Sequence, residues 1–233
     1  MTNDNNTKSK GDRKNKQQTK EGMWAKTIGK QLGNPERSVL GWLVSKLLIN
    51  HNQVLEESAV QLSGIHPGDT VLELGHGPGL GLQAAAKLLS SPLGHVIGVD
   101  YSEYMHQMAG ERLKGLVSSG KVTLHLSDVA AMPITDNTVD KVFHCNCYYF
   151  WPNLRKATTE IHRVMKPGGL MVTTLRLSSL ALASSRGILA AEKWNPHTYM
   201  SALTDAGFID VTMDDQRSRN VHFQVIYATA AQE

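Results

Sequence analysis

Short apolar runs alternate with amphipathic and turn-rich stretches along most of this chain. Seven runs have the β-branched or alternating composition of strands, namely residues 71–74, 95–100, 122–128, 140–146, 170–175, 208–213 and 221–227. Helix-like segments such as 82–89 follow the early strands. This alternation predicts a doubly wound α/β domain with a Rossmann-like sheet of seven strands. Most of these strands are expected to be parallel, with helices on both faces of the sheet. A polar turn joins the last two strands, which predicts a C-terminal antiparallel hairpin.

Two helical segments are expected before the first strand. Residues 39–48 carry an apolar stripe at helical spacing, and a second helix is expected over 53–62, before a Pro67-Gly68 turn. We therefore divide the chain into a basic leader, a helical cap over 27–66 and an α/β domain over 67–233. The cap is expected to cover a sheet edge, the mouth of a ligand site, or both.

The segment from Val71 to Gly81 contains the first strand and a glycine-rich turn that leads into the following helix. Such strand-turn-helix junctions often bind nucleotides. Glu73 stands two residues before the first glycine, where a carboxylate would repel the phosphates of a dinucleotide. The dinucleotide pattern G-x-G-x-x-G fails from Gly75 because its sixth position is Leu80. A G-x-G-x-x-A match over residues 79–84 begins too far past the strand. The acid suits a cationic ligand without phosphate, such as S-adenosylmethionine.

Two further acids stand where strands are expected to end. Asp100 closes the run 95–100, and a carboxylate there can accept hydrogen bonds from both ribose hydroxyls. Asp128 closes the run 122–128 and can accept from an adenine amino group. Asp100 indicates nucleoside binding, and it fits a dinucleotide and a methyl donor equally well.

Five motifs in order resemble the class I S-adenosylmethionine-dependent methyltransferases, in particular the small-molecule branch that includes the ubiquinone/menaquinone C-methyltransferases. They are the Glu73-x-Gly75-x-Gly77-x-Gly79 turn, Asp100, Ser127-Asp128-Val129, residues 134–143 and the His162 to Gly169 turn. The resemblance covers about Val54 to Val225, with Val139 in place of the usual Phe.

This resemblance implies a Rossmann-like sheet, S-adenosylmethionine as cofactor, S-adenosylhomocysteine as product and a small-molecule acceptor. It assigns cofactor binding to Glu73, Gly75, His76, Gly77, Gly79, Asp100, Tyr101, Met105, Asp128, Val129 and Cys145.

Residues at the end of the run 140–146 are the candidates for holding the acceptor, because ligands bind at the carboxyl ends of strands in such sheets. We assign catalytic roles to Asn146 and Tyr149, with His144 as a candidate base. Tyr148 and Trp151 are further candidates to face the methyl group. Methyl transfer is an in-line displacement that depends mainly on proximity and orientation, so it requires no triad and no metal.

Composition bears on the size of the core, the cellular compartment and the classes of partner. The chain has 233 residues, 41% of them hydrophobic, which is enough for one sizeable core. Its two cysteines, Cys145 and Cys147, do not suit a disulfide, and a reducing, cytoplasmic compartment is expected. We expect no metal site, no membrane span and no nucleic-acid partner. A nicotinamide-dependent reductase and a non-catalytic cofactor-binding scaffold remain alternatives, and the oligomeric state stays open.

The positive charge of the chain is concentrated at its start. Residues 1–26 hold seven Lys or Arg and three Asp or Glu, whereas the whole chain has a net charge of only +3. A Lys-, Asn- and Gln-rich segment with almost no apolar residues cannot pack a core. We therefore expect a disordered basic leader.

Deletion of residues 1–21 is accordingly expected to leave the melting temperature and the cofactor affinity unchanged. Differential scanning fluorimetry and calorimetry of the full and shortened chains measure both quantities, and limited proteolysis should trim the leader first. A loss of cofactor affinity would show instead that the leader folds over the site.

Overall fold

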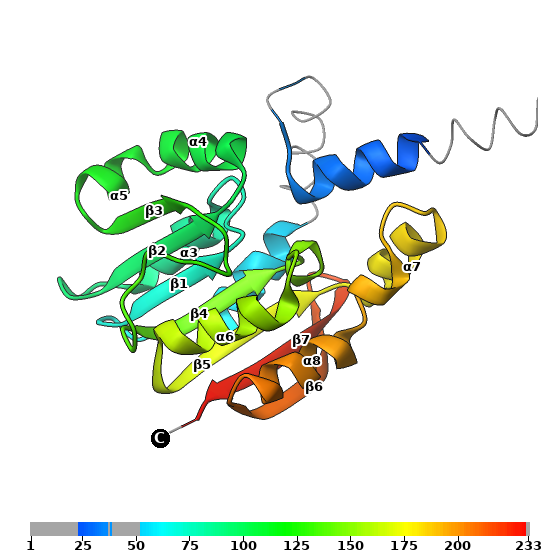
Figure 1. The fold of residues 1–233 in the computed structure, drawn as a ribbon. Coiled ribbons are helices and arrows are strands. Elements are labelled where there is room, and N and C mark those ends of the chain that lie inside the picture. The colour runs from blue at the N-terminus through cyan, green and yellow to red at the C-terminus, as the bar shows by residue number, and fades with distance from the viewer. Residues whose placement is uncertain (1–22, 37, 39–51, 232–233) are drawn as a thin grey trace, which may run out of the picture.

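Seven strands form one mixed sheet between two layers of helices (Figure 1). The structure is a computed structural model that describes residues 23–36, 38 and 52–231. The sheet order is β3-β2-β1-β4-β5-β7-β6, in which β1 to β5 are parallel and β7 runs antiparallel to both of its neighbours. The strands are β1 Thr70–Leu74, β2 His95–Asp100, β3 Val122–Leu126, β4 Val139–Cys145, β5 Met165–Leu175, β6 Phe208–Ser218 and β7 Val221–Ala230. The predicted fold class is confirmed.

Helices connect the strands and cover both faces of the sheet. They are α3 Leu80–Leu88, α4 Glu103–Arg112, α5 Lys114–Ser118, α6 Leu154–Val164, α7 Leu177–Ser185 and α8 Pro196–Asp205, with 3-10 turns at Tyr148–Phe150 and Ala191–Lys193. Residues 23–33 and 52–62 are also helical. The predicted helix over 39–48 and residues 1–22 of the leader lie outside the described residues.

Several predicted boundaries differ from the structure. The fifth strand begins at Met165 rather than at residue 170, and the last two strands extend to Ser218 and Ala230 rather than to residues 213 and 227. The third strand ends at Leu126, so Asp128 stands in the loop that follows. The expected helix over 177–193 ends at Ser185, because Gly187 adopts a left-handed backbone with φ 68°. A 3-10 turn then occupies Ala191–Lys193.

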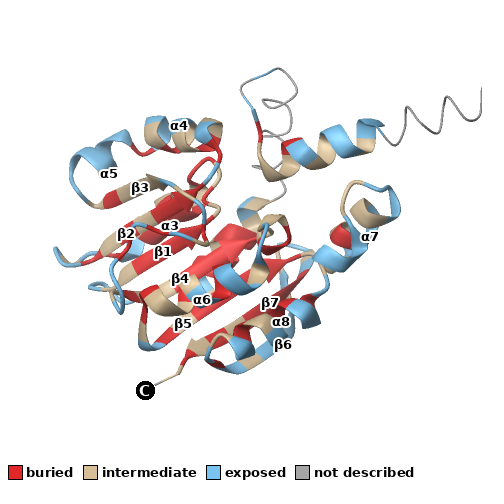
Figure 2. Ribbon diagram, in the orientation of Figure 1, coloured by how far each residue is buried: buried red, intermediate tan, exposed pale blue. Residues whose placement is uncertain are grey.

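Side chains along each strand point alternately to the two faces of the sheet, so the interior consists of two hydrophobic cores, one on each face. Leu72 and Leu74 of β1 are buried in the cluster formed with α6 and α8. Val71 is buried in the other cluster, with α3 and the helix 52–62. Figure 2 shows the buried strands between these layers. Because successive side chains point to opposite faces, Glu73 shares the face of Val71 and points toward α3.

The carboxyl ends of the central strands meet at one edge of the sheet. Strand order reverses between β1 and β4, a switch point where open α/β sheets bind ligands. The helix 23–33, blue in Figure 1, lies over this edge between α4 and α7. Two hydrogen bonds hold its end: the Tyr101 hydroxyl donates to Gly33 O at 2.7 Å, and the Ser102 hydroxyl donates to Pro35 O at 3.0 Å.

Candidate functional site

A cavity of about 460 Å³ opens at this edge, within the range of about 300–1,000 Å³ typical of small-molecule sites. Its described walls come from the loops after β1 and β3, the ends of β2, β4 and β5, the 3-10 turn Tyr148–Phe150, α4, α7 and the helices 23–33 and 52–62. The cavity therefore spans both sides of the switch point.

The turn after β1 requires glycine. Gly75 and Gly77 line the cavity at φ 64° and 51°, and Gly79 is the N-cap of α3 at φ 83°. A side chain at Gly75 would be strained and would lie 3.1 Å from Cys147 Cβ. The turn therefore presents bare backbone to the cavity beside the helix N-terminus.

Asp100 joins this turn to the start of α4. Its Oδ2 accepts from the Gly77 backbone N–H at 2.9 Å, and its Oδ1 accepts from the Ser102 N–H at 2.8 Å. The side chain lines the cavity, although the residue is only 7% exposed. An ionised carboxylate has about four acceptor positions, so two remain for a ligand.

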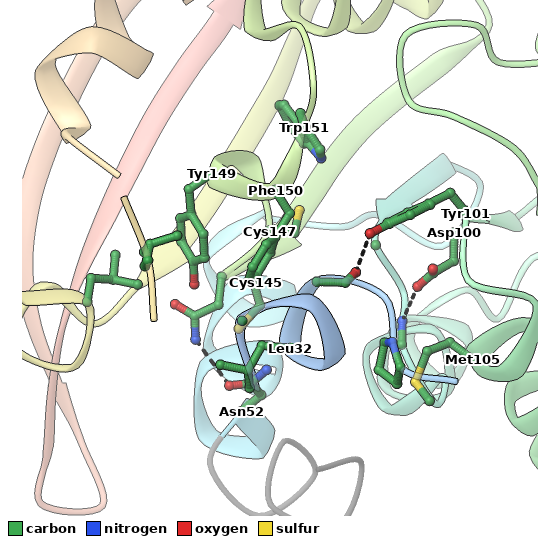
Figure 3. Close-up of a pocket in the computed structure, with 18 of the residues that line it drawn as sticks. Leu32, Asn52, Asp100, Tyr101, Met105, Cys145, Cys147, Tyr149, Phe150 and Trp151 are labelled. Carbon is green, nitrogen blue, oxygen red and sulfur yellow. Dashed lines mark hydrogen bonds between the residues drawn. The ribbon is translucent and has the colours of Figure 1, made fainter. Parts of the chain in front are cut away.

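Four more of the predicted cofactor residues line the same part of the cavity: Tyr101, Met105, Asp128 and Val129. Figure 3 shows Asp100, Tyr101 and Met105 on one side, and Asn52 and Tyr149 on the other. These side chains come from the ends of β2 and β3 and from α4, as the sequence predicted.

Glu73 lies behind the wall of the cavity. It is 2% exposed, and its pKa is raised well above the usual range by burial and then by the nearby Glu56 carboxylate. A Cβ on Gly81 would overlap the Glu73 carboxylate, so helix and acid fit only because residue 81 is glycine. The expectation that Glu73 faces the ligand directly needs correction, because strand alternation turns it toward α3.

A different carboxylate lines the cavity where Glu73 was expected, namely that of Glu56 from the helix 52–62. Burial raises its pKa to about 7, and its Oε2 has no hydrogen-bond partner among the described residues. A buried carboxylate oxygen without a partner is costly. A cationic group in the cavity would satisfy it.

Two predicted histidines do not line the cavity. His76 is fully buried, its Nδ1 lies 2.8 Å from Gly77 O, and burial lowers its pKa. His144 is fully buried on the face of β4 that packs against α8, 2.8 Å from the Tyr199 hydroxyl and 2.8 Å from Thr173 Oγ1. Burial lowers the pKa of His144 to about 3. This residue is a neutral hydrogen-bonding group of the core, so the assignment as a base is corrected.

A pH dependence of stability follows from the burial of His144. Its pKa falls from 6.5 to about 3 on folding, so the unfolded chain binds more protons between these values. Stability from this group is therefore present above about pH 6.5 and is lost as pH falls, by up to about 1.4 kcal/mol per pH unit. Urea unfolding between pH 7 and 4 measures this slope.

His144→Gln, which does not titrate, should flatten the slope. His197→Gln, at an exposed position of the same α8 helix that carries Tyr199, should leave it unchanged. Equal slopes for all three proteins would contradict the assignment.

The opposite wall holds the remaining candidates. Asn146 and Tyr149 both line the cavity, as does Cys145. Cys147 also lines it but lies against the glycine turn, where its Sγ donates to Leu74 O at 3.4 Å. Asn146 stands at φ 50° and its Nδ2 donates to Asn52 Oδ1 at 3.1 Å, while its own Oδ1 has no partner among the described residues. A polar oxygen is thus available at the end of β4.

Some of the other aromatic residues near the end of β4 line the cavity, and one is part of the hydrophobic core. Trp151 lines the cavity, as does Phe150. Tyr148 instead donates to Trp194 O at 2.6 Å and stacks on Tyr199 with ring centroids 4.2 Å apart. The expectation that Tyr148 faces a methyl group is therefore corrected.

Several cavity residues were missed from the sequence, among them Asn52, Glu56 and Arg176. Glu56 carried a signal, since it occupies an apolar-face position next to the buried Leu55 and four residues before Val60. Arg176 stands between β5 and α7, where periodicity gives no information.

In the part of the chain that the structure describes, no helix has the length and apolarity needed to cross a bilayer. Within the same residues, no three His, Cys, Asp or Glu side chains are grouped to hold a metal ion. Both cysteines are free thiols.

Sequence comparison matches residues 72–173 to the methyltransferase domain family. The methyltransferase YdaC of Bacillus subtilis, whose own function is uncharacterised, is 32% identical over 130 residues, covering 56% of this chain and 68% of YdaC. The ubiquinone/menaquinone biosynthesis C-methyltransferase UbiE of Hydrogenovibrio crunogenus is 34% identical over 121 residues. That alignment covers 52% of this chain but only 47% of UbiE.

Solved structures share the fold. A SAM-dependent methyltransferase from Aquifex aeolicus superposes with a TM-score of 0.62 at 23% identity, over 80% of this chain and 97% of that protein. A methyltransferase from Haloferax volcanii, solved with the Trm112 methyltransferase activator, gives a TM-score of 0.68 at 19% identity, over 81% and 94%. With the YdaC match and the motifs around the cavity, these findings place the chain in a family: it belongs to the class I S-adenosylmethionine-dependent methyltransferases.

Proposed function

We propose that this chain transfers a methyl group from S-adenosylmethionine to a small-molecule acceptor bound over the ends of β4 and β5. The observation that carries the proposal is the continuity of the cavity. It runs from the Asp100-held glycine turn to Asn146 and Tyr149 without leaving the carboxyl edge of the sheet. One cavity can then hold a nucleoside donor and, beside it, an acceptor.

The described residues fit the donor. S-adenosylmethionine is cationic at its centre and carries an ammonium group, and the buried Glu56 Oε2 lacks a partner on the cavity wall. We assign Glu56 to this cationic part and Glu73 to a supporting role behind it. Asp100 is assigned to the ribose hydroxyls, and Asp128 with Val129 to the adenine.

The bound donor supplies a methyl carbon that its sulfonium already activates. The chain then has to hold the acceptor atom in line with this carbon at about 3 Å. We assign that task to Asn146 and Tyr149. The Asn146 Oδ1 can accept a hydrogen bond from the acceptor, while Trp151 and Phe150 exclude water on the same side.

The organisation proposed from the sequence fits this function. The domain over 67–233 would hold donor and acceptor, and residues 27–66 would cover them. Leu32 and Pro35 of this cap line the cavity, which supports that role. The free thiols of Cys145 and Cys147 support a reducing, cytoplasmic location.

Calorimetric titration tests the donor. S-adenosylmethionine and S-adenosylhomocysteine are expected to bind, whereas NAD and NADP should bind far more weakly, because the Gly77 N–H of the glycine turn already donates to the Asp100 carboxylate and is not free for a phosphate. Tighter binding of NAD would favour a reductase and contradict the proposal. Donor binding without turnover on any screened acceptor would favour a non-catalytic scaffold.

A further inference from the structure

The charges that line the cavity are divided between its two ends. Glu56, Asp100 and Asp128 supply carboxylates on the side of β1 to β3. Arg176 follows β5 directly and is the one cationic side chain among the described residues of the lining. The donor side is thus acidic, and the acceptor side carries a single guanidinium.

This guanidinium has no protein partner in the described part of the chain. The Arg176 Nε is buried without a hydrogen-bond partner, and its side chain takes part in no ion pair there. Partly buried arginines are normally paired, because an isolated charge away from water is costly. Arg163, by comparison, pairs with Glu160 and Asp136.

The surroundings of Arg176 complete an anion site. It is the N-cap residue of α7, a nine-residue helix whose dipole favours negative charge at this end, although the first N–H of the helix, that of Leu177, already donates to Gln224 Oε1 at 3.0 Å. Ser179, in the first turn of α7, also lines the cavity. The cavity lining next to them along the chain is apolar, with Leu180, Ala183 and Leu189.

We infer that the acceptor has an apolar body and an anionic group, a carboxylate or a phosphate, which Arg176 binds in two parallel hydrogen bonds. This inference rests on the proposed function and names its substrate class. The donor carboxylate is the other anion at the site. Arg176 follows β5, two positions from β1 in the sheet order, whereas the glycine turn follows β1. This separation places Arg176 on the acceptor side.

Matched probes test the inference. Octanoate, octyl phosphate and octanol share one apolar chain and differ in charge. Each is titrated by calorimetry into the full chain after saturation with S-adenosylhomocysteine. At least one anionic probe should bind more tightly than octanol by about tenfold or more, and the tighter of the two identifies the anion.

Three variants accompany the probes. Arg176→Gln should remove the preference for anions, and Arg176→Lys should retain part of it. Arg186→Gln, at an exposed position just after α7, should keep it fully. S-adenosylhomocysteine should bind all variants with the affinity of the wild type.

Each remaining outcome is decisive. Equal binding of octanol and both anions, or an anion preference that survives in Arg176→Gln, would overturn the inference while leaving the methyltransferase proposal intact. A loss of S-adenosylhomocysteine affinity in Arg176→Gln would also overturn it, because Arg176 would then hold the donor carboxylate. Failure of the wild type to bind S-adenosylhomocysteine would instead refute the proposed function.

Discussion

Asp100→Ala is expected to weaken binding of S-adenosylhomocysteine by about a hundredfold or more. Two ribose hydroxyls donating to one buried carboxylate form two charge-assisted hydrogen bonds, each worth roughly 1.5–3 kcal/mol. The variant also removes the acceptors for the Gly77 and Ser102 N–H groups. The glycine turn therefore loosens as well, and a lower melting temperature is expected.

Calorimetry well below the melting temperature separates the two effects. Asp100→Asn keeps the size and one carbonyl acceptor, so an intermediate affinity is expected. Asp205→Ala, on the exposed end of α8, removes a carboxylate far from the cavity and should change nothing. Unchanged affinity in Asp100→Ala would mean that β2 does not end at the ribose.

Substitutions in the wall that we assign to the acceptor should reduce the rate of methyl transfer without changing the affinity for the donor. Tyr149→Phe and Asn146→Gly are each expected to slow methyl transfer by about a hundredfold, since a misplacement of about 1 Å has this cost. Glycine is chosen at position 146 because the residue stands at φ 50°, where alanine would add backbone strain. Their affinity for S-adenosylhomocysteine should equal that of the wild type.

The assay uses the acceptor found by screening small molecules with the wild type. Tyr148→Phe is the matched control, because that hydroxyl bonds Trp194 O and does not line the cavity. If Tyr149→Phe and Asn146→Gly lose donor affinity instead, both residues belong to the donor pocket. The acceptor must then enter elsewhere.

The half of the cavity that we propose to hold the donor was predictable from the sequence, because local signals determine it. Glycines after an apolar strand and acids at strand ends occupy positions fixed by the βαβ unit, and Gly75, Gly77 and Asp100 lie where expected. Glu73 shows the limit of this reasoning. Its spacing from the glycine suggested contact with the ligand, whereas the two-residue period of β1 turns its side chain toward α3.

The acceptor half depends on packing between distant segments. His144 lies within β4 and is covered by Tyr199 of α8, which is 55 residues further along the sequence. Asn146 has the same strand parity as His144, but it stands just past the end of β4 with a left-handed backbone at φ 50°, where the alternation no longer holds. Arg176 and Asn52 join the wall through tertiary structure alone. No periodicity in the chain marks such residues, so they became visible only in the folded structure.

The central claim is that one cavity places the donor over β1 to β3 and the acceptor over β4 and β5. A crystal structure of the chain with S-adenosylhomocysteine tests it most directly. The ribose hydroxyls should lie within hydrogen-bond distance of Asp100, the ammonium group should lie near Glu56, and the sulfur should point toward Asn146 and Tyr149. An adenine seated beside Arg176, or a ribose away from Asp100, would contradict this account.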